Sequence, residues 1–145
     1  MSPSRVVRVY LPVDAAQLRE LHEQARIAEP PPAFAVTPRL ARAAAGADTE
    51  ELEYAAMLAA AAHAAAQRGL VRVRRVVAAA DLPAAVVAEP IDPLEVPLAQ
   101  VRVLEPVLRR QVASFQVDEL PGGSSDDDLM WYDATELDTV RDLAG

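Results

Sequence analysis

Three apolar runs that each stop at a proline constrain the fold of this chain more than any other feature. They cover residues 6–12, 33–38 and 73–83, and helix-forming sequence follows the first two. A long alanine-rich segment, residues 48–68, separates the second run from the third. Strands that alternate with helices are typical of α/β domains, because parallel strands need a helical connection. We therefore expect an α/β fold, a three-layer sandwich of four to five mostly parallel strands with helices on both faces.

Polar residues mark where the helices should begin. Asp14 and Gln17 have the spacing of a capping box, in which each side chain bonds to the backbone of the other residue. Thr37 precedes Pro38, and proline suits the first helical position because its missing N–H is not needed there. Asp48 precedes the alanine-rich segment. The sequence predicts helices that begin directly after Asp14, Thr37 and Asp48.

The second half of the chain is punctuated by prolines and acidic residues. Residues 101–104 predict a further strand. Residues 106–115 have apolar side chains at helical spacing, although SFQV at their end could equally form a strand. We interpret residues 106–115 as an amphipathic helix.

The C-terminal region begins with LPGGSSDDD, residues 120–128, a composition typical of flexible connectors. LMWY, residues 129–132, then predicts a short strand, and a capping box at Asp133 leads into a short helix. We expect an α/β core domain over residues 1–119 and a flexible acidic connector over residues 120–128. Residues 129–145 should form a strand–helix segment that packs on the core.

Composition excludes several classes of site. The chain has no cysteine, which rules out disulfide bonds, zinc–thiolate sites and thiol nucleophiles. It has no apolar run long enough to span a membrane, and its N-terminus lacks the apolar region of a signal peptide, so we expect a cytoplasmic protein. All fourteen basic residues are arginine and alanine is abundant, which indicates a GC-rich coding bias typical of actinomycetes.

Charge is distributed unevenly along the chain. Residues 1–80 carry ten arginines against eight acids, whereas residues 81–145 carry four arginines against fourteen acids. Binding along a nucleic-acid backbone needs a clustered basic face, so we expect no nucleic-acid partner. The acidic half either keeps the protein soluble or engages another protein.

No catalytic motif is present. The serines lack the G-x-S-x-G elbow of serine hydrolases, and the five glycines form neither a P-loop nor a dinucleotide-binding fingerprint. Glu50 and Glu53 could share a divalent ion with Asp81, but acids in a first helical turn already complement the helix dipole. His22 and His63 lie on apolar helix faces and are more typical of packed residues than of ligands. We expect no metal and no cofactor.

Four residues form a candidate ligand site. If the strands are parallel, their carboxyl ends bring Tyr10, Thr37, Arg39 and Asp81 to one edge of the sheet, where open α/β sheets bind ligands. Hydroxyl, guanidinium and carboxylate groups suit a polar small molecule. The alternative is structural, with Thr37 as a helix cap and Asp81 as the cap of the turn that follows it.

Trp131 and Tyr132 form a candidate partner site. They follow the acidic connector and supply two of the six aromatic side chains. One interpretation is that they dock the C-terminal segment onto the core as an edge strand. The other is that they present an aromatic hot spot to a partner.

Five blocks carry a resemblance to a known family, namely RVYLP at residues 8–12, AFAVTP, EELEYAAM, RRVVAAADLP and LMWYDATEL. Together they resemble a family of small, acidic, uncharacterised actinobacterial proteins, a domain of unknown function. The resemblance implies a cytoplasmic protein of one domain. It supplies no activity, substrate or site.

These observations favour a non-enzymatic, cytoplasmic binding or regulatory module that engages a protein partner through its acidic C-terminal half. The alternative is a small enzyme that binds a polar metabolite, with or without a divalent metal, at the carboxyl ends of the strands. A third interpretation is a structural homodimer formed through the alanine-rich helix. The sequence is compatible with a monomer and with a homodimer.

Overall fold

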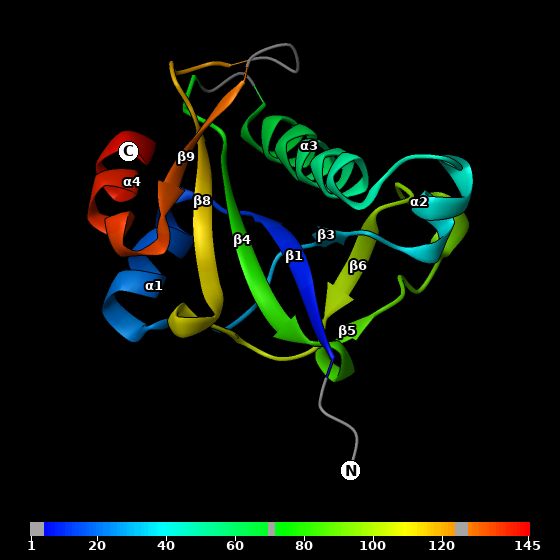
Figure 1. The fold of residues 1–145 in the computed structure, drawn as a ribbon. Coiled ribbons are helices and arrows are strands. Elements are labelled where there is room, and N and C mark those ends of the chain that lie inside the picture. Colours follow the sequence, from blue (N-terminus) through cyan, green and yellow to red (C-terminus); the bar gives the residue numbers. More distant parts are fainter. Residues whose placement is uncertain (1–4, 70–71, 124–127) are drawn as a thin grey trace.

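A computed structural model describes residues 5–69, 72–123 and 128–145, and a seven-stranded sheet forms its centre (Figure 1). Its order is β5-β6-β3-β1-β4-β8-β9, and every neighbouring pair is antiparallel. The strands are β5 (Val87–Ala88), β6 (Gln100–Val103), β3 (Ala33–Ala35), β1 (Val6–Pro12), β4 (Val76–Pro83), β8 (Val112–Asp118) and β9 (Leu129–Asp133). A separate two-stranded sheet joins β2 (Arg26–Ile27) to β7 (Val107–Leu108).

Helices lie against both faces of the large sheet (Figure 1). They are α1 (Ala15–Gln24), α2 (Pro38–Ala43), α3 (Thr49–Arg68) and α4 (Leu137–Ala144), with short 3-10 turns η1 (Ala84–Val86), η2 (Pro93–Glu95), η3 (Arg109–Gln111) and η4 (Ala134–Glu136). Alternation along β1 separates two cores, because successive strand side chains point to opposite faces. Val9 and Leu11 join the core under α1 and α4, whereas Tyr10 joins the core under α3.

The expectation of mostly parallel strands is wrong. β3 and β4, which flank the long helix in sequence, run in the same direction, but β1 lies between them and is antiparallel to both. The register of β1 with β4 runs from Val6↔Pro83 to Pro12↔Val77. An apolar run ending at a proline identifies a strand but carries no information about its neighbour or its direction. The α/β sandwich of four to five mostly parallel strands is therefore replaced by an antiparallel sheet of seven strands with helices on both faces.

The helix expected over residues 106–115 is also wrong. These residues form β7, the η3 turn and the first part of β8. Along β8, Phe115 and Val117 face the core under α1 and α4, while Ser114 and Gln116 point to the other face. β4 needs a partner for the backbone groups of its second edge, and β8 supplies it from Val76↔Val117 to Ala80↔Val112. Pairing along a whole strand outweighs a local apolar spacing that suits either structure.

The predicted helix caps are confirmed. The Asp14 carboxylate accepts a hydrogen bond from the Gln17 N–H (2.8 Å), and the Gln17 side chain accepts one from the Asp14 N–H (3.0 Å). Thr37 caps α2 through the Leu40 N–H, and Asp48 accepts from the backbone N–H at the third position of α3. Caps depend only on residues three apart in sequence, so the local pattern determines them.

A buried ion pair joins three parts of the fold. Arg75, just before β4, and Asp118, the last residue of β8, are both buried. The Asp118 carboxylate accepts from the Arg75 backbone N–H (2.6 Å) and from its guanidinium (2.8 Å), and Arg68 at the end of α3 lies 3.8 Å away. Gly123 packs so closely on Asp118 that a Cβ there would collide with the carboxylate. This contact fixes the end of α3, the start of β4 and the turn after β8 relative to one another.

Candidate functional site

Two of the four candidate ligand residues meet on the sheet face under α3. Arg8 on β1 is paired in register with Asp81 on β4, and its guanidinium donates two hydrogen bonds to the Asp81 carboxylate (2.6 and 3.0 Å). Tyr10, two residues along β1, donates from its hydroxyl to Glu53 on α3 (3.5 Å). Two acids, a guanidinium and a phenol therefore form one polar cluster around Tyr10 and Asp81.

The cluster raises the pKa of two of its members. Burial raises the pKa of Tyr10 above its ordinary value of 10.0, and the neighbouring Glu53 carboxylate raises it further. The hydrogen bond from Arg8 to Asp81 raises the pKa of the guanidinium. Tyr10 therefore stays a neutral hydrogen-bond donor at physiological pH.

We expect the Tyr10→Phe variant to lose less stability than the wild type above pH 10. The pKa of Tyr10 is higher in the folded state than in the unfolded state. The contribution of this shift to stability is therefore fully present below the unfolded-state pKa and is lost as the pH rises through the folded-state pKa. Urea unfolding between pH 8 and pH 11 measures the difference. Tyr54 is exposed, so Tyr54→Phe supplies the control. If the free energy of unfolding falls equally steeply with pH in the two variants, the raised pKa of Tyr10 is contradicted.

The other two candidate ligand residues bond elsewhere. Besides capping α2, Thr37 donates from its hydroxyl to the Leu98 carbonyl (2.5 Å). Arg39 donates to the carbonyls of Pro93 (2.7 Å) and Gln100 (3.4 Å). Both side chains hold the segment between β5 and β6. The structure thus separates the four residues into two pairs with different partners.

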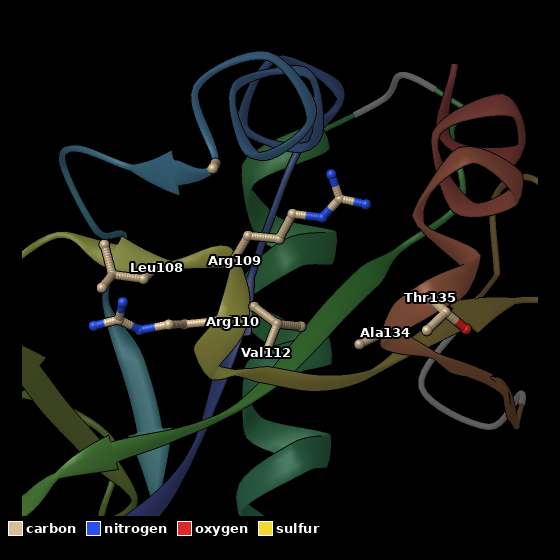
Figure 2. A pocket seen from close by; sticks show the side chains of 7 residues that line it. Leu108, Arg109, Arg110, Val112, Ala134 and Thr135 are labelled. Carbon is tan, nitrogen blue, oxygen red and sulfur yellow. The ribbon is translucent and has the colours of Figure 1, made fainter.

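Two cavities lie away from all four candidate ligand residues. The first, about 600 Å³, is an open hollow beside the η3 turn, and its apolar lining comes from Ala25, Leu108, Val112 and Ala134. Figure 2 shows the last three of these. Arg109 extends toward the side where Thr135 lies, and Arg110 extends the other way, past Leu108 (Figure 2). The second, about 470 Å³, lies where β1 ends and β4 begins, and His63, Gln67, Arg68 and Arg74 contribute to its wall.

The described residues hold neither a metal-binding cluster nor a membrane-spanning helix. Within residues 5–69, 72–123 and 128–145, no three histidine or acidic side chains are grouped closely enough to hold a metal ion. His63 packs on the ring of Phe34, with ring centroids 5.7 Å apart, and His22 lies 3.4 Å from Asp138 on α4. None of the helices in this described part combines the length and apolar character needed to cross a bilayer.

The two candidate partner residues have different environments on β9. β9 lies at the end of the sheet and pairs with β8 from Ser114↔Asp133 to Asp118↔Leu129. Tyr132 is half-buried against the core, whereas Trp131 is 63% exposed and its neighbour Met130 is 48% exposed. Sequence reasoning identified Trp131 but missed Met130, whose only signal was its place beside the tryptophan.

Acidic residues surround this edge strand. Glu119 follows β8, Asp128 precedes β9, and both are exposed. At the other end, Asp133 accepts hydrogen bonds from the N–H and the hydroxyl of Thr135 (2.9 and 2.7 Å), which lower the pKa of its carboxyl. The apolar side chains of β9 therefore lie between negative charges at both ends of the strand.

Comparison with known proteins gives one result. The model of a protein family described as a family of unknown function (DUF6912) matches residues 7–121. No curated protein and no solved structure matches the chain. The resemblance to an uncharacterised family is thereby confirmed, while the actinobacterial origin stays a prediction.

Proposed function

The chain belongs to this family of unknown function, and we propose that it is a cytoplasmic, non-enzymatic binding module that engages a basic protein partner through β9. The observation that carries the proposal is the position of Trp131. A large aromatic side chain, 63% exposed, lies in the middle of a strand that ends the sheet.

An end strand can extend its sheet with a strand from another protein. Among the described residues, β9 is paired only through β8, so the backbone N–H and C=O groups of its outer edge are available. Added strands gain affinity from main-chain hydrogen bonds and specificity from alternate side chains. Natural proteins usually protect such edges with lysine, with proline or with a very short strand. β9 has five residues and contains neither lysine nor proline.

The charge around β9 supports a basic partner. Glu119, Asp128, Asp133 and Glu136 flank the strand, so a partner segment with arginine or lysine on both sides of an apolar centre is complementary. Pairing of β9 with β9 of a second copy would instead bring these acids together, which opposes a dimer through this edge. We therefore favour an extended basic segment over a second copy.

The alternative of a small enzyme has less support. Asp81 is held by Arg8, while Thr37 and Arg39 bond to the segment after β5. Neither of the two cavities described above is lined by Tyr10, Glu53 or Asp81. A catalytic role needs convergent groups beside a space for substrate, and these residues do not supply that arrangement.

A library of linear dodecapeptides displayed on phage tests the proposed function. Selection on the full-length protein should enrich arginine or lysine alternating with β-branched or aromatic residues. Binding of a synthesised winner should fall at least tenfold in the Trp131→Ser variant, because a central aromatic hot spot contributes about 2 kcal/mol or more. Fluorescence polarisation measures the affinity.

The control is Tyr54→Ser, which removes an exposed aromatic side chain from α3, away from β9. This variant should bind the selected peptide as the wild type does. Winners without basic enrichment, or equal affinity for the two variants, would contradict the proposal. Methylating alternate peptide nitrogens should also abolish binding, since strand addition depends on main-chain hydrogen bonds.

A further inference from the structure

The segment between β5 and β6 exposes more apolar surface than an ordinary loop. We name residues 89–98 the apolar loop. Leu94 is 95% exposed and Ile91 is 78% exposed, and Leu98 is exposed as well. Single exposed apolar residues are normal, but several within one short loop mark an interaction surface. The acids Asp92 and Glu95 lie between them in sequence and are also exposed.

The apolar loop is held in a fixed shape. Arg102 donates to the carbonyl of Glu89 (2.8 Å), Arg39 to that of Pro93 (2.7 Å) and Thr37 to that of Leu98 (2.5 Å). Prolines at 90, 93 and 97 restrict the backbone further. The bonds fix main-chain groups and leave the side chains of Ile91 and Leu94 outward. A loop fixed in this way loses little conformational entropy on binding.

The hollow beside η3 has the complementary composition. Leu108, Val112 and Ala134 contribute apolar surface, and Arg109 and Arg110 contribute positive charge (Figure 2). Within the described part of the chain, neither arginine side chain has an ion pair or a side-chain hydrogen bond. The two acids nearest in sequence to the lining bond to neighbouring groups. Asp133 accepts from the N–H and hydroxyl of Thr135, and Glu136 accepts from the Asp133 N–H.

We propose that the apolar loop of one copy docks into the hollow of a second copy. Ile91 and Leu94 would pack on the apolar lining of the hollow. Asp92 and Glu95 would then face its two arginines, Arg109 and Arg110. Charges farther apart than about 8 Å are screened at physiological ionic strength, so the groups in contact outweigh the net charge of −8.

The geometry makes this contact head-to-tail. The loop joins β5 and β6 at one end of the sheet, whereas the hollow lies at the start of β8, on the side of α1 (Figure 1). One chain therefore cannot fill its own hollow. A head-to-tail contact builds a ring or an open chain of copies instead of stopping at a self-complementary dimer. One loop in one hollow is a small interface, so the association is weak and depends on concentration.

Sedimentation velocity of the full chain from micromolar to near-millimolar concentration tests the proposal. The wild type should show a rising mean mass that passes beyond that of a dimer. Leu94→Ser should remain monomeric, as should two charge-reversed proteins, Asp92→Arg with Glu95→Arg and Arg109→Glu with Arg110→Glu. All five positions are exposed, so the variants keep the fold, which circular dichroism verifies.

Mixing the two charge-reversed proteins gives the decisive result. Each then offers the other a matching loop and a matching hollow, so assembly should return in the mixture and in neither protein alone. Arg5→Glu with Arg42→Glu is the control with the same change of charge at exposed sites outside both surfaces, and it should assemble as the wild type does. A wild type that stays monomeric, or a mixture that does not assemble, overturns the proposal.

This inference is independent of the proposed function. Trp131→Ser should leave assembly unchanged, and the loop and hollow variants should bind the selected basic peptide as the wild type does. Loss of assembly in Trp131→Ser would place the contact on β9 and overturn docking through the apolar loop. Unchanged peptide affinity in Trp131→Ser, with intact assembly, would contradict only the role of β9.

Discussion

Replacing Asp118 with alanine is expected to lower the free energy of unfolding by about 3–5 kcal/mol. In the wild type, the Asp118 carboxylate accepts hydrogen bonds from the backbone N–H, Nε and Nη2 of Arg75. The substitution removes this carboxylate from beside the buried guanidinium. It also removes the group to which Arg68 and Gly123 pack. Because domains are stable by only about 5–15 kcal/mol, the variant should be close to the limit of folding.

Urea unfolding monitored by the fluorescence of Trp131 and by circular dichroism measures this loss. Asp92→Ala supplies the control, because Asp92 is exposed and its removal should change stability by less than about 0.5 kcal/mol. Removing both charges with Asp118→Leu and Arg75→Met should recover much of the lost stability, since taking one member from a buried ion pair costs more than replacing the pair with apolar residues. A loss below 1 kcal/mol in Asp118→Ala would show that the pair is not buried in solution.

Leu137→Ala is expected to cost about 2–5 kcal/mol and to shift the unfolding of the whole domain. Leu137 begins α4 and is 1% exposed, and it belongs to the same core as Leu11, Leu21 and Phe115. Val140, one turn later, is buried in that core as well. Truncating Leu137 leaves a cavity under α1 and α4 that the sheet cannot fill.

Hydrogen exchange separates this outcome from a detachable C-terminal segment. If residues 129–145 are integral to the core, Leu137→Ala should lower protection in β4 and β8 together with α4. If the segment detaches by itself, protection should fall in α4 and β9 alone, and the midpoint of global unfolding should stay where it is. Thr139→Ala is the matched control, because Thr139 is an exposed residue of the same helix.

Thr37 and Arg39 illustrate how a candidate site residue changes meaning in the structure. Hydroxyl and guanidinium groups near strand ends are typical of ligand sites, and the sequence offers one local alternative, the helix cap that Thr37 forms. In the structure their partners are carbonyls of residues 93, 98 and 100, which lie more than fifty positions away in the chain. Sequence spacing carries no signal for such bonds, so the role of these residues in fixing the apolar loop emerged only in three dimensions.

The sequence by itself determined the features that depend on neighbours a few residues apart. Asp14, Thr37 and Asp48 cap helices because a side chain three positions before a free N–H reaches it regardless of the rest of the fold. LMWY, residues 129–132, predicts a strand for the same local reason, because these residues favour extended backbone, and β9 forms over Leu129–Asp133.

The tertiary structure decided strand direction, strand order and the fate of residues 106–115. Each depends on which backbone edge lies beside which, and β1 inserted between β3 and β4 pairs residues as far apart as Val6 and Pro83. The same holds for the exposure of Trp131 and Leu94, because burial depends on what the rest of the chain leaves uncovered. Short-range hydrogen bonds are encoded by spacing, whereas pairing and burial follow from the competition of all segments for the same edges and the same core.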